Sequence, residues 1–427
     1  MHWGMGPWLA MTTLLPAPRR LRRAALSGEA LVFSAATVVA LLHAFDDAFL
    51  HRQPGLGIGQ HALAAAIAAV GALAAILAFP SLRSGLRAGL ALTFGSLAIV
   101  NGFQHLNHIS VDGASQSDLT GVLAAAAGLV LVGLAVSIPW RHRGTGSWRS
   151  RAVAAVALPV TAIAVLGPIG MAQFDAHKWR EPIGAPPSAA YEPVAFEASD
   201  GLELKGWYRP SSNGAAVIVV HGGGGDRTGA VRHAEMLARH GYGALVYDAR
   251  GRGESEGSPN GYGWDWEKDV SGALRYLHTR PDVDGTRIGA LGLSTGADVL
   301  LQVAAETDDL KAVVTDGAAA GSFEDWARLR GTEIGTVPGW VMFTGIRVLT
   351  GDAPPPPLQD QVAKIDEPLM LIGAGINEEH EFNELYAEAA PHAEHWDVDA
   401  GHTAALRERP DEYEERVAGF FDQALAG

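Results

Sequence analysis

The chain has 427 residues, a formal net charge of −15 at pH 7 and no cysteine. Without cysteine, the sequence excludes disulfides, thiolate zinc sites and a cysteine nucleophile. Residues 1–172 carry a net charge of +6 and residues 173–427 carry −21, and an acidic domain of this size argues against a nucleic-acid partner.

The first part of the chain is predicted to be a membrane domain. Five apolar stretches, rich in Ala, Gly and Leu, each come close to the ~20 residues that cross the hydrocarbon core: 29–50, 61–80, 86–109, 119–139 and 151–171. Buried helices of a soluble bundle would need charged exposed faces, which these stretches lack. We therefore expect an all-α bundle of about five transmembrane helices at 29–172, after a cytoplasmic segment at 1–28.

The arginines predict how this domain is oriented. In a five-helix topology the arginine clusters at 19–23, 83–87 and 141–151 fall on one side of the membrane. The loops on the other side carry only Arg52, Asp112 and Asp118 as charged residues. The positive-inside rule puts the N-terminus in the cytoplasm, so we expect a multi-pass cell-membrane protein whose second part is extracytoplasmic.

Ionisable residues gather inside the predicted spans. His43, Asp46 and Asp47 lie near the end of the first span, and His105 and His108 near the end of the third. Spacings of three or four residues put the members of each group on one helix face. Placing ionisable side chains inside a membrane costs free energy, so their presence points to a function or to pairing. They fit either a zinc or other divalent-metal site or a structural pairing between helices.

A linker at 173–192 leads to a second domain at 193–427, in which strand and helix patterns alternate. A short apolar strand at 215–220 runs into His221-Gly222-Gly223-Gly224-Gly225. Glycines leave room for backbone N–H groups to face an anion. A phosphate loop is the alternative, but neither Gly-Lys-Ser/Thr nor a G-x-G-x-x-G helix start follows.

The run Gly292-Leu293-Ser294-Thr295-Gly296 lies between an apolar strand at 287–291 and a helical pattern at 297–305. In this setting G-x-S-x-G is typical of a nucleophile elbow, a sharp turn that exposes the serine oxygen. Residues 317–360 are long enough to form a cap over such a site. The cap contains an apolar run at 337–349. Three alternatives are open for this run: it lines an acyl pocket, it dips into the bilayer surface, or it only packs on the sheet.

These motifs together resemble the α/β-hydrolase superfamily over residues 191–426. The segment 248–257, with the pattern D-x-R-G-x-G-x-S-x-G, carries the same resemblance and is expected to be structural. The resemblance implies a doubly wound, mostly parallel sheet. It also implies Ser294 as nucleophile and the backbone N–H groups of Gly223 and Thr295 as the oxyanion hole.

The resemblance implies the other two members of a catalytic triad as well. The acid is expected on the loop after the strand at 368–372, where Glu378 replaces the usual Asp, with Glu379 and Asp316 as alternatives. The general base is expected just after the last strand, in Gly401-His402. This gives the order serine, acid, histidine along the chain.

The sequence therefore predicts a membrane-anchored serine hydrolase that cleaves an ester or amide bond through an acyl-enzyme, like a carboxylesterase, lipase or peptidase. The expected partners are a small-molecule or lipid-like ester substrate and membrane lipids. No cofactor is expected apart from the divalent metal considered above. One alternative is a non-catalytic membrane sensor or scaffold with a hydrolase-fold binding domain. The other is a membrane metal-binding protein with an accessory hydrolase.

Overall fold

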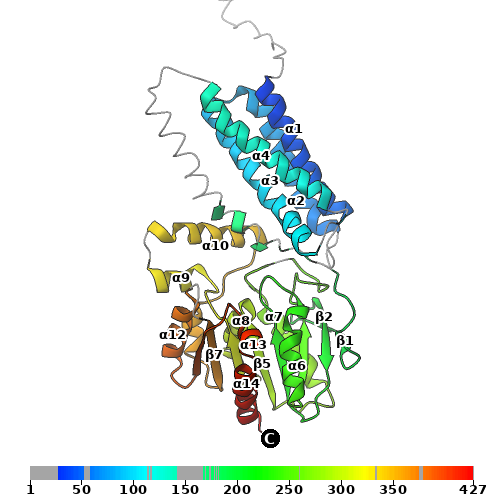
Figure 1. Ribbon diagram of the computed structural model, residues 1–427, viewed down its shortest axis with the longest axis vertical. Coiled ribbons are helices and arrows are strands. Elements are labelled where there is room, and N and C mark those ends of the chain that lie inside the picture. Colours follow the sequence, from blue (N-terminus) through cyan, green and yellow to red (C-terminus); the bar gives the residue numbers. More distant parts are fainter. Residues whose placement is uncertain are drawn as a thin grey trace, which may run out of the picture.

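The computed structural model of the chain describes residues 27–51, 58–112, 115, 118–141 and, apart from gaps of one to three residues, 167–426. Two parts are visible in Figure 1: a bundle of long helices, and a sheet covered by helices on both faces. The predicted fifth span, at 151–171, lies largely outside the described residues, as do residues 1–26 and most of the linker up to 181.

Four helices form the described bundle: α1 (Gly28–Phe45), α2 (Ile58–Ala78), α3 (Ser84–Asp112) and α4 (Asp118–Arg141). In the described residues, three helices are long and apolar enough to cross a membrane, and Ala68–Ser81 is a shorter apolar helix. The three long ones are Gly28–Leu50, Ser84–Phe103 and Asp118–Pro139. The expected count of about five is thus matched only roughly.

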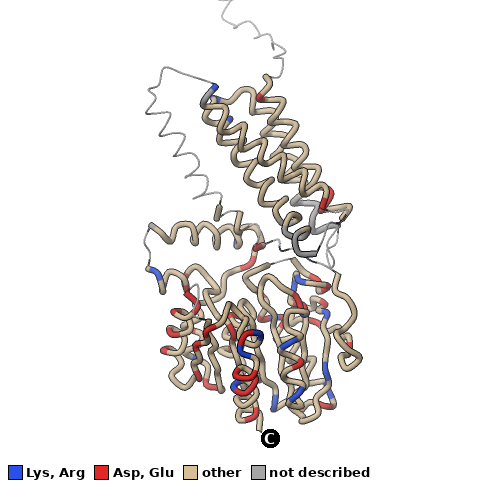
Figure 2. Tube along the Cα trace, viewed as in Figure 1, with Lys and Arg blue, Asp and Glu red and all other residues tan. Residues whose placement is uncertain are grey.

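Glycine allows α3 and α4 to pack closely. A Cβ on Gly102 would lie 2.4 Å from the carbonyl oxygen of Gly121, and one on Gly128 would lie 2.7 Å from the carbonyl oxygen of Gly95. Small residues that let backbones approach in this way are typical of helix interfaces in membranes. Charged residues of the bundle lie near its two ends, and its middle carries none (Figure 2).

The second part contains one eight-stranded sheet with the order β1-β2-β4-β3-β5-β6-β7-β8. Pairing is antiparallel between β1 and β2 and between β2 and β4, and parallel for all other neighbours. The predicted fold class, a mostly parallel doubly wound sheet preceded by a helical bundle, is confirmed. The strands are β1 (Glu192–Glu197), β2 (Glu203–Arg209), β3 (Ala216–Val220), β4 (Gly243–Tyr247), β5 (Ile288–Leu293), β6 (Val313–Asp316), β7 (Leu369–Ala374) and β8 (Glu394–Val398).

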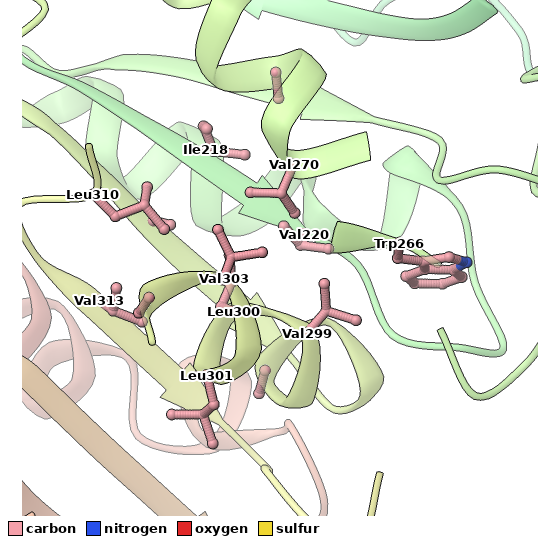
Figure 3. Packing of buried hydrophobic residues seen from close by; sticks show 14 of the residues in the cluster. Ile218, Val220, Trp266, Val270, Val299, Leu300, Leu301, Val303, Leu310 and Val313 are labelled. Atoms are coloured by element: carbon pink, nitrogen blue, oxygen red, sulfur yellow. The ribbon is translucent and has the colours of Figure 1, made fainter. Parts of the chain in front are cut away.

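Helices cover both faces of this sheet, because the central strands are apolar on both sides. One face packs on α7 (Glu267–His278), α8 (Thr295–Ala304), α11 (Leu358–Val362) and α12 (Glu379–Ala389). The other packs on α6 (Val231–Arg239), α13 (Ala405–Glu408) and α14 (Pro410–Ala424). Figure 3 shows the first core, in which Ile218 and Val220 of β3 meet Val299 and Val303 of α8.

The predicted cap is helical. After β6 the chain forms α9 (Phe323–Arg330) and α10 (Val337–Thr350) before it reaches α11. Helix α10 lies between the sheet and the bundle, across the direction of the bundle helices (Figure 1). Its Met342, Phe343 and Ile346 pack with Trp264 and with Ala172, which follows the predicted fifth span. The cap therefore contacts both the sheet domain and the end of the membrane part.

Candidate active site

Ser294 lies at a strained turn between β5 and α8. Its φ of 55° and ψ of −123° place it in a region that non-glycine residues rarely adopt, and such strain is concentrated at functional sites. A Cβ on Gly292 would lie 2.4 Å from the carbonyl oxygen of Gly296, and one on Gly296 would lie 2.5 Å from that of Val220. Both flanking positions therefore require glycine, and the turn has the geometry expected of a nucleophile elbow.

Ser294, His402 and Glu379 form a continuous hydrogen-bonded series. The Ser294 hydroxyl donates to Nε2 of His402 over 2.9 Å, and Nδ1–H of His402 donates to Oε2 of Glu379 over 2.6 Å. Glu379 is buried, and its second oxygen accepts a bond of 2.7 Å from the backbone N–H of Ala374. The bond to Glu379 is the main reason why the pKa of His402 lies above its ordinary value. This arrangement suits proton transfer from serine to imidazole.

Among the described residues, no hydrogen bond or ion pair joins His402 to Glu378, the first choice for the acid. Glu378 precedes α12 in a left-handed conformation, with φ of 67°, and its carboxylate pairs with Arg330 at 2.5 Å. Glu379, one residue later, is the first residue of α12, and its side chain points inward to His402. The structure therefore pairs His402 with Glu379, which was an alternative, and not with the first choice, Glu378.

The other alternative, Asp316, lies at the end of β6 and is buried, which raises its pKa to about 7. In the described part of the chain no hydrogen bond joins Asp316 to His402, so it does not replace Glu379 as the partner of the imidazole.

The glycine loop after β3 lies against the elbow. A Cβ on Gly222 would lie 3.2 Å from Cβ of Ser294, and one on Gly223 would lie 2.6 Å from Oγ1 of Thr295. His221 fixes this loop: its Nδ1–H donates to the carbonyl oxygen of Gly222 over 2.8 Å, and its Nε2 accepts from the backbone N–H of Ala249 over 3.1 Å. Burial lowers the pKa of His221 to about 4, which keeps it neutral in this role.

Gly223→Ala is expected to lower kcat by about 10²- to 10³-fold, the usual cost of losing one oxyanion donor. The added Cβ would lie 1.9 Å from the carbonyl oxygen of Gly261, so the loop has to shift and its N–H loses its position. Steady-state kinetics with a soluble ester tests this, with Gly224→Ala as control because a Cβ there meets no atom within 4 Å. Equal losses in both variants would contradict a specific role for Gly223.

A cavity of about 600 Å³ opens above the serine. Its lining includes Ser294, His402 and Asp298. Its apolar walls come from the cap, from the chain next to the bundle and from α12: Pro168, Met171, Trp326, Pro338, Met342, Phe343 and Phe382. Asp298 was not predicted from the sequence. Burial raises its pKa to about 8, and it accepts a bond of 2.8 Å from the backbone N–H of Ala319. The sequence offered one indication that Asp298 lies at the site: it follows Ser294 by four residues, about one helical turn into α8.

None of the predicted metal-site residues lies in this cavity. His43, Asp47 and His105 come together in the bundle, within 4.8 Å of one another by their possible ligand atoms. Asp46 lies beside them and accepts from the Thr120 hydroxyl over 2.6 Å. The side chain of His108 lies outside the described residues.

Two relatives are similar to parts of the chain. "Uncharacterized protein Rv2307c" of Mycobacterium tuberculosis is 36% identical over 165 residues, which is 35% of this chain and 57% of the relative. "Thiohydrolase" of Eupenicillium brefeldianum is 40% identical over 116 residues, which is 26% of this chain and 38% of the relative. The chain thus spans about half the length, or less, of the curated relatives it matches.

Solved structures are similar to the sheet domain at low identity. The esterase Pf2001 of Pyrococcus furiosus has a TM-score of 0.49 and 23% identity, and covers 59% of this chain and 98% of its own. Est1E of Butyrivibrio proteoclasticus, bound to ferulic acid, has a TM-score of 0.44 and 19% identity, and covers 55% and 100%.

The sequence model of one protein family matches residues 174–414, which is more than half of the chain and includes the elbow, the loop after β7 and His402. The chain belongs to the X-Pro dipeptidyl-peptidase (S15) family, and its sheet domain is an α/β hydrolase.

Proposed function

We propose that this protein is a membrane-anchored serine hydrolase that cleaves a carboxylic ester of a lipid-like substrate through an acyl-enzyme. The observation that carries the proposal is the series from Glu379 through His402 to Ser294, at the floor of a largely apolar cavity. The apolar walls favour an acyl chain over a polar peptide as the group that fills the cavity.

The proposed reaction has two halves. In the first, Nε2 of His402 takes the proton of the Ser294 hydroxyl while the oxygen attacks the ester carbonyl carbon. The backbone N–H groups of Gly223 and Thr295 stabilise the oxyanion, and Glu379 stabilises the imidazolium. The imidazolium then protonates the departing alcohol, which leaves the acyl group on Ser294. In the second half His402 activates a water molecule, which releases the carboxylic acid and restores the serine.

We also propose that the bundle spans the cell membrane with the active site on the extracytoplasmic side. Two features support this orientation. Arg87 and Glu29 form an ion pair of 3.0 Å near the start of α3 and of α1, and Arg141 ends α4. Figure 2 shows the Lys and Arg residues of the bundle at its end remote from the sheet domain, and basic residues favour the cytoplasmic side.

The position of α10 suggests how substrate reaches the serine. One face of α10 lines the cavity through Met342 and Phe343. Another exposes apolar side chains, with Trp340 at 54% and Val348 at 76% exposure. An exposed apolar helix face with an interfacial tryptophan, next to membrane spans, fits a helix that lies in the bilayer surface. Lipid-like substrate would then enter the cavity from the membrane.

The double variant Trp340→Glu/Val348→Glu is expected to lower kcat/KM for long-chain esters in vesicles at least tenfold. Two carboxylates on this face oppose insertion into the bilayer surface. Hydrolysis of a short, water-soluble ester should stay within about twofold, because neither side chain lines the cavity. The measurement is hydrolysis of both esters by the full chain reconstituted in vesicles.

The matched control is Gln423→Glu, which adds a negative charge at an exposed position of α14, far from the bundle. It should leave both activities unchanged. Parallel losses on both esters in the α10 variant would indicate a damaged fold rather than a lost membrane contact, and equal activity on long-chain esters would refute the membrane route.

The proposed function is tested by labelling the full-length protein in membranes with a fluorophosphonate. Labelling of the wild type, and none of Ser294→Ala or His402→Ala, is the expected result. A probe that cannot cross membranes should label intact cells if the site is extracytoplasmic. No labelling of a folded wild-type protein would contradict the proposal and favour the non-catalytic sensor.

Substrate preference is measured on the same full-length protein in membranes. Nitrophenyl esters of increasing chain length are compared with an X-Pro anilide, the amide substrate that the family match suggests. We expect kcat/KM to rise with acyl chain length and to be far lower for the anilide. The reverse order would assign the protein a peptidase activity.

A further inference from the structure

The membrane bundle contains a compact group of three side chains that the hydrolase chemistry does not use. Nε2 of His43 and Nε2 of His105 each lie 3.4 Å from the same carboxylate oxygen, Oδ2 of Asp47. Both histidines are buried, with His43 at 1% exposure. The three residues come from α1, the turn that follows it, and α3.

The hydrogen bonds of the outer ring nitrogens indicate which atom of His43 faces the centre. The Thr120 hydroxyl donates its single proton to Asp46 over 2.6 Å, so it can only accept from Nδ1–H of His43, 3.2 Å away. With the proton on Nδ1, the neutral ring presents the lone pair of Nε2 to Asp47. That Nε2 has no hydrogen-bond donor among the described residues.

His105 is held in the same way. Its Nδ1 lies 3.1 Å from Oδ1 of Asp118, a carboxylate that can only accept from it. Its Nε2 therefore also points inward. Metal-ligating histidines usually donate their other ring N–H to a carboxylate or another oxygen acceptor, which fixes the tautomer and the ring. In this tautomer the two imidazoles and the one carboxylate make a set of converging acceptors. The 3.4 Å contact of His105 Nε2 with Oδ2 of Asp47 is a hydrogen bond only when that nitrogen carries a proton.

Two of the three spacings match a tetrahedral metal, and all three candidate ligand atoms lie within 4.8 Å of one another. Zinc bonds of ~2.05 Å separate neighbouring ligand atoms by about 3.4 Å, which is the distance of each Nε2 from Oδ2 of Asp47. The second oxygen of Asp47, Oδ1, is buried and without a hydrogen-bond partner among the described residues. Without a cation, the lone pair of His43 and the carboxylate would face each other unfavourably.

The backbone around the group is adapted to hold it. The helix that carries His43 changes to a π-helical turn at Asp46–Leu50, a feature frequent at functional sites. A Cβ on Gly121 would lie 2.3 Å from Cδ2 of His105, so glycine is needed there for the ring to fit. The two rings meet edge to face, with centroids 4.9 Å apart.

We infer that His43, Asp47 and His105 bind a divalent metal, with zinc as the ion that best fits two imidazoles and one carboxylate. Three protein ligands leave a fourth position for water, as in zinc sites that are not purely structural. Asp46, Thr120 and Asp118 orient the ligands. The inference is independent of the proposed serine chemistry, because none of these residues lines the cavity at Ser294.

The test is metal analysis of the full-length protein, purified in detergent, loaded with zinc and freed of excess metal. About one zinc per chain is expected for the wild type and for Ser294→Ala. Asp47→Asn and His43→Gln should lose it. His51→Gln is the matched control, because His51 pairs with Asp46 outside the ligand set, and it should retain zinc. Zinc should raise the melting temperature of wild type but not of Asp47→Asn.

Cobalt gives a readout that does not depend on the variants. Wild-type protein loaded with Co²⁺ should show visible d–d absorption of the strength typical of four-coordinate sites. No stoichiometric metal, no cobalt bands and equal metal content in wild type and Asp47→Asn would each overturn the inference. The group would then be a proton-linked pairing between helices.

Discussion

Glu379→Gln is expected to lower kcat by about 10³- to 10⁴-fold, with little change in KM. The amide cannot stabilise the imidazolium, and its NH₂ favours the tautomer with the proton on the wrong ring nitrogen. Glu378→Gln is the matched variant, because Glu378 pairs with Arg330 and not with His402. Its kcat should stay within about threefold of wild type. Kinetics of both variants on one soluble ester decides which glutamate is the acid.

The pH dependence gives an independent check of the same assignment. The general base must be neutral, so activity is lost as the pH falls through the pKa of His402. The bond to Glu379 raises that pKa above its ordinary value of 6.5. Glu379→Gln removes the main cause, so the acid limb of its residual kcat/KM should move to lower pH. Glu378→Gln should leave the limb where it is.

The reverse pattern, with the large loss in Glu378→Gln, would mean that the loop after β7 takes up another conformation when substrate is bound. Equal and small losses would remove the carboxylate from the mechanism and leave a serine–histidine pair.

Local patterns in the sequence were enough to predict the sheet and the position of the serine. The elbow needs glycine at two fixed positions because backbones approach there, and this requirement is visible in Gly292 and Gly296. His402 was predicted because it directly follows the last strand. Both features depend on short segments whose geometry is set by neighbouring residues.

The choice between Glu378 and Glu379 could not be made in this way. Both carboxylates fit the spacing, and only the left-handed conformation of Glu378 and the start of α12 decide which of them turns inward. Asp298 was missed for a related reason, since its place at the cavity depends on how α8 packs beside the cap. The sequence placed His43 and His105 near the ends of two spans, but their atomic spacing required the packed bundle.

Arg250→Met is expected to destabilise the sheet domain by about 3–5 kcal/mol at pH 8, the usual cost of leaving one member of a buried ion pair without its partner. Arg250 donates to Asp269 from its backbone N–H over 2.7 Å and from Nε over 2.8 Å, and to Asp200 from Nη1 over 2.9 Å. Asp269 is fully buried. For a domain of this size the loss corresponds to a melting temperature lower by about 10 °C, measured by tryptophan fluorescence.

The loss should depend on pH in a defined direction. Burial raises the pKa of Asp269 to about 7 even with Arg250 present, which is above its value in the unfolded chain. The free energy of unfolding therefore falls as the pH rises from about 4 to about 7. Without Arg250 the pKa rises further, and Asp269 stays protonated at pH 5. The variant should therefore be closer to wild type at pH 5 than at pH 8, and Arg250→Met/Asp269→Asn should recover much of the stability at pH 8.

Arg328→Met is the matched control for Arg250→Met. Arg328 makes a two-pronged ion pair with Asp360, at 2.6 and 2.8 Å, but that pair is exposed to solvent. Exposed pairs contribute about 1 kcal/mol or less, so Arg328→Met removes an arginine–aspartate pair without leaving a carboxylate buried. A loss in Arg328→Met as large as that in Arg250→Met would show that pairing, and not burial of Asp269, sets the cost. If only Arg250→Met is destabilised, the segment 248–257 is structural. The same segment holds the glycine loop through the bond from the backbone N–H of Ala249 to His221.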